Sequence, residues 1–262
     1  MRILLTNDDG FDAPGILALY QAIQHLGEVF PIAPLTVQSA TSHGITFNDP
    51  LMTRALTAGT CMQGIAVDGR PADCVKLAIS ALWPERFGSG EKPDLTISGM
   101  NAGANVGINV LYSGTVAAAV ESAYLGVPAI AVSLHLGPNR KPHFQRAAEI
   151  AAVVVERILE HPLDPHAVVN VNVPITESAD APQPPVHVTE MNLAPGRDLY
   201  ERRTSPAGDA YYWMTNNGMD FTHSGPETDV EALARLAVSV TPLSYLLTDR
   251  HRLDVWRSRL AE

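Results

Sequence analysis

Two adjacent carboxylates, Asp8 and Asp9, follow a short apolar run near the start of the chain. Neighbouring carboxylates repel each other unless a cation or hydrogen-bond donors neutralise them. A divalent ion such as Mg²⁺ or Mn²⁺, which prefers oxygen ligands, does this directly. The competing interpretation is that the pair caps a following helix, since Asp is common at that position. Asp12, just before Pro14, is the better capping candidate, which leaves the pair for a metal ion.

A second cluster is the glycine- and asparagine-rich segment SGMNAGANVG, residues 98–107. Glycine permits tight turns and close approach to a ligand. Asparagine offers a carbonyl oxygen to a metal and an amide donor to a phosphate. The segment is neither a dinucleotide fingerprint nor a P-loop, and a purely structural loop is the alternative. We expect Asn101, Gly103 and Asn105 to contribute to a metal and phosphate site.

A third cluster, Ser113, Gly114 and Thr115, opens a predicted Ala-rich helix over residues 115–126. A helix N-terminus presents unpaired N–H groups and a partial positive charge, which suits an anion. Simple capping by a hydroxyl is the alternative, and both roles can hold at once. These residues, together with Asn7 beside the carboxylates, are therefore predicted to bind phosphate.

The fourth cluster is the hydroxyl-rich segment QSATSHG, residues 38–44. Ser39 is a candidate for a further metal ligand and a phosphate donor. His43 has the chemistry of a general acid or base near neutral pH. A single histidine in a loop is more often exposed to solvent, so its role stays open.

The elements that would carry these clusters alternate between strands and helices. An apolar run at 3–5, a helical pattern at 15–26 and a second apolar run at 29–33 predict a strand, a helix and a parallel strand. The same reading predicts helices over 73–83, 115–126 and 144–159, and strands over 93–99, 128–134 and 168–174. This indicates a doubly wound α/β core with a mostly parallel sheet over residues 1–174. Ligands bind outside the carboxyl ends of strands in such sheets, where the four clusters fall.

Residues 175–262 have a different character. They begin with a Pro-rich polar connection and continue with short strand-like runs and loops. A short amphipathic helix is predicted from about Asp249. We expect this extension to pack on the core or on a neighbouring subunit.

Composition, charge and missing motifs exclude several classes of function. Of 262 residues, 46% are hydrophobic, and the net charge of −10 argues against binding polymeric nucleic acid. A small phosphorylated substrate stays compatible with that charge. Cys61 and Cys74 are expected to be buried, reduced and inert. The chain lacks a secretory signal and an apolar run long enough for a membrane helix, so we expect a soluble, cytoplasmic protein. GxSxG, HExxH and CxxC motifs are absent.

The chain resembles the SurE family of survival-protein nucleotidases in motifs that occur in the family's order: NDDG, QSA…IT, GRPADCVKLA, SGMNAGANVG, YSGTVAAAVE, GVPAIAVSL, VVNVNVP and TDVEAL…VSVTPL. The resemblance spans nearly the whole chain. It implies a phosphatase that depends on a divalent metal and acts on nucleoside 5′- and 3′-monophosphates, in some members also on short polyphosphate. It also implies a Rossmann-like core whose C-terminal extension assembles a homodimer or homotetramer.

The resemblance further implies one divalent ion per subunit, Mg²⁺ or Mn²⁺, with Asp8, Asp9, Ser39 and Asn101 as ligands. We favour in-line attack by a water associated with the metal. Covalent attack by Asp8 or Asp9 is the alternative, although carboxylates held by a metal are poorer nucleophiles. Two other classes compete. A haloacid dehalogenase-type phosphatase needs Asp-x-Asp where this chain has an adjacent pair, and a nucleotide-binding module would bind without hydrolysis.

Three positions depart from the family's usual residues. Ala40 stands where glycine is common, and it could stiffen the segment that presents Ser39. Asn109 stands where aspartate is frequent, and Ser122 where glycine is common. None is a predicted ligand, so the departures bear on substrate preference.

Overall fold

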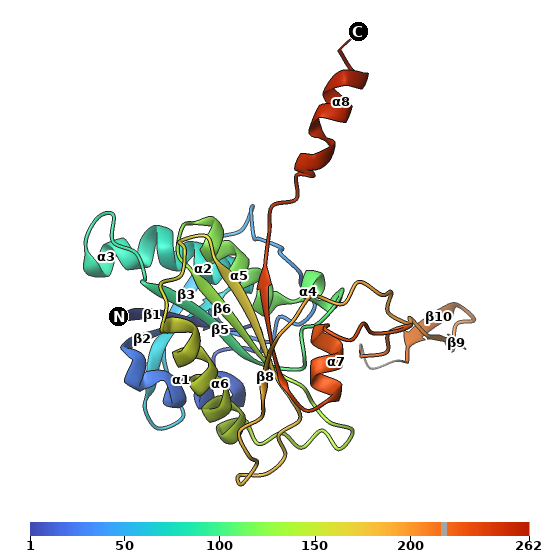
Figure 1. Cartoon of the computed structure of the whole chain (residues 1–262). Helices are drawn as coiled ribbons and strands as arrows, with labels where there is room; N and C mark the ends of the chain where they lie inside the picture. The colour runs from blue at the N-terminus through green and yellow to red at the C-terminus, as the bar shows by residue number, and fades with distance from the viewer. Residues whose placement is uncertain (216–218, 262) are drawn as a thin grey trace.

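A nine-stranded sheet forms the centre of the computed structural model, which describes residues 1–215 and 219–261 (Figure 1). Its order from one edge to the other is β3 (Met52–Ala58), β4 (Met62–Asp68), β2 (Glu28–Pro34), β1 (Arg2–Thr6), β5 (Leu95–Ala102), β6 (Ala129–Leu134), β7 (Val168–Val173), β11 (Val238–Leu243) and β8 (Val186–Val188). The six strands from β4 to β7 in this order run parallel to one another. The expected doubly wound, mostly parallel α/β core is confirmed.

Helices cover both faces of this sheet (Figure 1). Successive side chains of a strand point to opposite faces. Leu5 of β1 accordingly packs with α1 and α6, whereas Leu4 packs with residues of α2 and α5. Burial on both faces explains why the central strands read as unbroken apolar runs. The helices of the core are α1 (Pro14–Ile23), α2 (Pro71–Leu77), α3 (Trp83–Phe87), α4 (Asn109–Tyr112), α5 (Gly114–Tyr124) and α6 (Phe144–Leu159).

Most predicted elements are present, with shifted ends. The helix predicted over 144–159 has those bounds, and the helix predicted over 15–26 ends with a 3-10 turn at Gln24–Leu26. The helix predicted over 73–83 begins at Pro71 and continues through a π-helical turn, Ala78–Leu82, into α3. The patterns missed the β3–β4 hairpin, because β3 is exposed almost throughout and so lacks an apolar face.

Three local predictions were wrong. Asp12 does not cap α1, because Ala13 occupies the N-cap and makes no side-chain hydrogen bond. Cys61 is exposed in the turn between β3 and β4, and only Cys74 is buried as expected. The first half of segment 98–107 is not a loop, since β5 continues to Ala102 past a bulge after Gly99.

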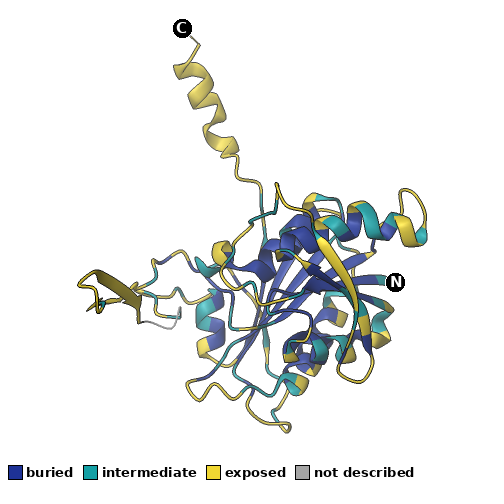
Figure 2. Ribbon diagram, turned by 180° about the vertical axis from the view of Figure 1, so that it is seen from behind, coloured by how far each residue is buried: buried dark blue, intermediate teal, exposed yellow. Residues whose placement is uncertain are grey.

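The extension after Pro174 shares the central sheet. From beyond that residue, β11 pairs antiparallel with β7, and β8 pairs with β11. The short helix α7 (Asp229–Ala234) precedes β11. Two parts project from the body: the hairpin of β9 (Tyr200–Thr204) with β10 (Ala210–Met214), and the terminal α8 (Leu253–Arg259) (Figure 1). Both are exposed along their length (Figure 2).

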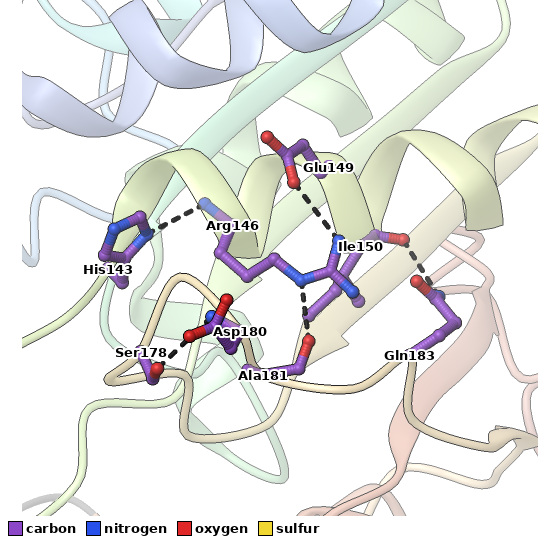
Figure 3. A network of polar contacts seen from close by, with 8 residues as sticks. All are labelled: His143, Arg146, Glu149, Ile150, Ser178, Asp180, Ala181 and Gln183. Carbon is purple, nitrogen blue, oxygen red and sulfur yellow. Dashed lines mark hydrogen bonds and ion pairs between the residues drawn. The ribbon is translucent and has the colours of Figure 1, made fainter.

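Hydrogen bonds join the segment after β7 to α6 (Figure 3). Arg146 Nε donates to the carbonyl oxygen of Ala181 at 2.7 Å, and an Arg146 guanidinium nitrogen lies 3.1 Å from Glu149 Oε2. The backbone N–H of Arg146 donates to His143 Nδ1 at 3.2 Å, which closes the start of the helix. Across the described residues, no helix has the length and apolar character needed to cross a membrane.

Candidate functional site

Asp8 lies just past the carboxyl end of β1 and is almost fully buried, with 4% of its surface exposed. Its Oδ1 accepts a hydrogen bond from Thr115 Oγ of α5 at 2.5 Å. A Cβ atom on Gly114 would lie 2.8 Å from Asp8 Cβ, so only glycine permits this approach. The first predicted cluster is therefore in contact with the third, which starts more than a hundred residues later.

Asp9 connects the carboxylate pair to the second cluster. Its Oδ2 accepts a hydrogen bond from the backbone N–H of Ala102 at 2.9 Å. Asn101, the preceding residue, donates its side-chain amide to the carbonyl oxygen of Gly103 at 2.8 Å. Since that nitrogen is engaged, the Asn101 oxygen is the atom that can serve a cation. After the bulge in β5, Asn101 therefore directly precedes the residue that contacts Asp9.

The electrostatics of the pair favour a bound cation. Burial, reinforced by the negative charge of Asp9, raises the pKa of Asp8 to about 6 despite the Thr115 hydrogen bond. Burial also raises the pKa of Asp9, against the opposing hydrogen bond from Ala102. Within the described part of the chain, neither carboxylate forms a salt bridge. A buried carboxylate beside a partly buried one, with no salt-bridge partner among the described residues, suits a hard divalent ion.

The other predicted residues divide between the site and its support. Ser39 is exposed to solvent. It follows Gln38, whose backbone N–H donates to the Asp8 carbonyl oxygen at 2.7 Å, so Ser39 lies near the pair. Asn7 is fully buried and donates to the Gly10 carbonyl at 2.8 Å, which supports the turn. Ser113 caps α5 by accepting from Val116 N–H at 3.1 Å, as the capping interpretation expected.

Asn105 is tied to other strands. Its N–H donates to Asn172 Oδ1 at 2.8 Å and its side-chain amide to Ser133 Oγ at 2.9 Å. Its carbonyl oxygen accepts from Asn170 Nδ2 at 2.8 Å. These bonds anchor segment 98–107 to β6 and β7, and none of them reaches Asp8 or Asp9. Asn105 therefore supports segment 98–107, and its contact with phosphate stays a prediction.

Asp229 is a supporting residue that motif reasoning missed. It is fully buried at the start of α7. Its two oxygens accept from the backbone N–H groups of Gly107 at 2.9 Å, Asn192 at 2.9 Å and Val230 at 2.8 Å. The extension after Pro174 thereby holds the end of segment 98–107. Asp229 lies in the family motif TDVEAL, but its role was not visible there, since an acidic residue at a helix start is too common to single out.

His43 is anchored to α5 by a buried carboxylate, Glu121. The His43 Nε2 atom lies 2.7 Å from one Glu121 oxygen, and Lys76 Nζ lies 3.4 Å from the other. Burial acts to raise the pKa of Glu121, but the bonds from His43 and Lys76 outweigh it and lower the pKa. His43 therefore fixes segment 38–44, which presents Ser39, against the helix that begins at Gly114.

Known proteins resemble this chain in sequence and in fold. The model of the family described as "Survival protein SurE" matches residues 3–195. The chain is 42% identical to the protein named 5′-nucleotidase SurE of Carboxydothermus hydrogenoformans, covering 97% of this chain and 94% of that one. It is 44% identical to the same-named protein of Rhodopirellula baltica, covering 95% and 94%. The crystal structure of the SurE protein from Aquifex aeolicus has a TM-score of 0.82 and 32% identity, covering 99% of each chain. The chain therefore belongs to the survival protein SurE family.

Proposed function

We propose that this protein is a metal-dependent 5′-nucleotidase, a phosphatase that converts nucleoside monophosphates into nucleoside and phosphate. One observation carries the proposal: in a member of the SurE family, buried Asp8 lies against the start of α5 and the adjacent, partly buried Asp9 is held by Ala102 of β5. Relatives about 40% identical carry the name 5′-nucleotidase SurE. The proposal extends to 3′-monophosphates and to short polyphosphate.

The proposed ligands of one Mg²⁺ or Mn²⁺ ion per subunit are Asp8, Asp9, Ser39 and Asn101. The donor set fits such an ion, because it combines two carboxylates, a hydroxyl and an amide carbonyl, all hard oxygen donors. Only two of the four proposed ligands are acidic, and none is His or Cys. Among the described residues, no cluster of three or more acidic, His or Cys side chains could hold a metal. When bound, the ion would polarise the phosphoryl oxygens and the attacking water.

The protein's own residues position the reactants. The Thr115 hydroxyl donates to one oxygen of Asp8, and the Ala102 N–H donates to one oxygen of Asp9. The start of α5 lies against Asp8 at Gly114, and the N-terminus of a helix suits the non-bridging phosphate oxygens. We favour direct attack by water in line with the leaving oxygen. Isolation of a phosphorylated aspartate during turnover would replace that mechanism with a covalent one.

The decisive experiment measures phosphate release from nucleoside 5′- and 3′-monophosphates with Mn²⁺ or Mg²⁺, and then with excess EDTA. We expect release that EDTA abolishes and added metal restores. The Asp9→Asn variant should release at least a hundredfold less phosphate. Nucleotide binding without release under every metal condition would instead identify a binding module.

A homodimer or homotetramer and a cytoplasmic location belong to the proposal. The projecting α8 exposes Val255 and Trp256, and Leu260 directly after it is also exposed; an assembly interface buries side chains of this kind. Light scattering should report two or four chains per particle for the full chain. A chain ending at residue 247 should give smaller particles. Cell fractionation tests the location.

A further inference from the structure

A cavity of about 470 Å³ borders the end of β5 and the residues after it. Its wall includes Ala102, Gly103 and Ala104, the residues that follow Asn101. The N–H of Ala102 is the donor to Asp9 Oδ2, and the carbonyl oxygen of Gly103 accepts from Asn101. One short segment therefore contacts the carboxylate pair and also forms the cavity wall. The volume falls within the range of small-molecule sites.

The lining suits an uncharged ring system with a few polar groups. It combines the apolar Leu136, Pro138 and Ile175 with the imidazole of His135. Arg140 supplies a positive charge, and the described lining residues include no carboxylate. This lack of acidic groups is notable in a chain whose net charge is −10. An anionic nucleotide meets no repulsion there, and its base finds apolar contact.

His135 offers one hydrogen-bonding atom to the cavity. Its Nδ1 is sealed from solvent and has no hydrogen-bond partner among the described residues. The nitrogen that a ligand can reach is therefore Nε2. Burial lowers the pKa of His135, so the ring is neutral near pH 7. A neutral imidazole can pair with a ribose hydroxyl or a base edge without adding charge.

The cavity walls are held in place by neighbouring segments. The His135 N–H donates to the Val173 carbonyl at 2.9 Å, which extends the pairing of β6 with β7. The His143 N–H donates to the Thr176 carbonyl at 2.8 Å, and the network around Arg146 in Figure 3 fixes the following turn. A preformed pocket loses less entropy on binding than a mobile one.

We propose that this cavity binds the nucleoside part of the monophosphate substrate and that His135 Nε2 hydrogen-bonds to it. The inference rests on the nucleotidase activity proposed above and adds a location for the nucleoside. A second cavity, of about 390 Å³, also borders this region and contains Tyr112 and Phe221. It also presents Asp198 and Asp220, whose carboxylates would repel a phosphorylated ligand.

The test compares His135→Ala with wild type on a nucleoside 5′-monophosphate and on glycerol 2-phosphate, which has no base or ribose. His135→Gln keeps a side-chain donor and similar bulk. His161→Ala, at an exposed histidine outside this cavity, is the matched control. Tyr112→Ala tests the second cavity. Nucleotide affinity is also measured by calorimetry in EDTA, where hydrolysis does not occur.

We expect His135→Ala to raise KM for the nucleotide about tenfold at unchanged kcat, and to weaken nucleotide binding in EDTA by the same factor. Hydrolysis of glycerol 2-phosphate should stay within twofold, His135→Gln should recover most of the loss, and His161→Ala should match wild type. Equal losses on both substrates, no loss on either, or a selective loss only in Tyr112→Ala would each overturn the inference. If wild type hydrolyses nothing but the EDTA binding difference persists, the proposed activity fails and the nucleoside site stands.

Discussion

Replacing Asp8 with asparagine should stabilise the metal-free protein at neutral pH while it removes metal binding. In the wild-type fold the pKa of Asp8 is raised from 3.8 to about 6, first by burial and then by the charge of Asp9. At pH 7.5 the carboxylate is ionised in both the folded and unfolded states, so the fold carries the full cost of the shift. That cost is about 3 kcal/mol, from a shift of roughly two units at 1.36 kcal/mol each.

The sign of the pH dependence follows from the raised pKa. Asp8 imposes no cost on the fold below its unfolded pKa of 3.8, where it is protonated in both states. The cost grows as pH rises and is complete once the pH has passed the folded pKa of about 6. At pH 4.5 the cost falls to about 1 kcal/mol. Any effect of the new amide itself, such as an unpaired N–H, does not vary over this range. The difference between the two pH values therefore isolates the ionisation of Asp8.

The assay is urea unfolding in EDTA at pH 7.5 and pH 4.5, followed by far-ultraviolet circular dichroism. Asp8→Asn should gain about 2 kcal/mol relative to wild type between pH 4.5 and pH 7.5. Thr60→Ala, in the exposed β3–β4 turn, is a control that should show no such change. Added Mn²⁺ should raise the melting temperature of wild type and leave that of Asp8→Asn unchanged. A stability difference that is the same at both pH values would refute the argument that burial of this carboxylate destabilises the metal-free fold.

Three further changes test other parts of the site. Gly114→Ala places a Cβ 2.8 Å from Asp8 Cβ and should lower kcat/KM about a hundredfold with native circular dichroism, because small misplacements of catalytic groups are costly; unchanged kinetics would contradict the contact. Asp229→Ala leaves three backbone donors, among them Gly107 N–H, without their acceptor and should cost roughly 3–5 kcal/mol in urea unfolding; a loss under 1 kcal/mol would mean that water replaces the carboxylate. Ala40→Gly relieves a left-handed backbone (φ +55°) and should raise stability by about 0.5 kcal/mol after the extra chain entropy of glycine is counted, whereas a lower melting temperature would refute the strain.

Local sequence patterns predicted much of the core. The helix over 144–159 and the buried strands around β1 and β6 appear where periodicity and apolar runs placed them. Such signals work because a residue's neighbours along the chain determine its propensity and its face. The β3–β4 hairpin escaped because β3 is exposed almost throughout, so the alternation that marks a half-buried strand is weak there.

Predictions about individual side chains fared differently from predictions about elements. Asp12 and Cys61 were assigned from local averages, and the structure contradicts both. Asn105 looks like Asn101 in sequence, yet it is bound into the buried network with Asn170 and Ser133. The position of Asn101 relative to β6 depends on the bulge in β5, and such a one-residue shift leaves no periodic trace in the sequence.

The sequence by itself determined the chemistry and the elements of this protein: an adjacent carboxylate pair after a buried strand, a doubly wound core, and the ordered motifs of its family. Only the tertiary structure decided that Thr115 donates to Asp8, that Ala102 donates to Asp9, and that Asp229 holds the end of segment 98–107. The physical reason is range. Element formation follows from neighbouring residues, whereas these bonds join residues 93 to 122 positions apart and exist only once the sheet has assembled.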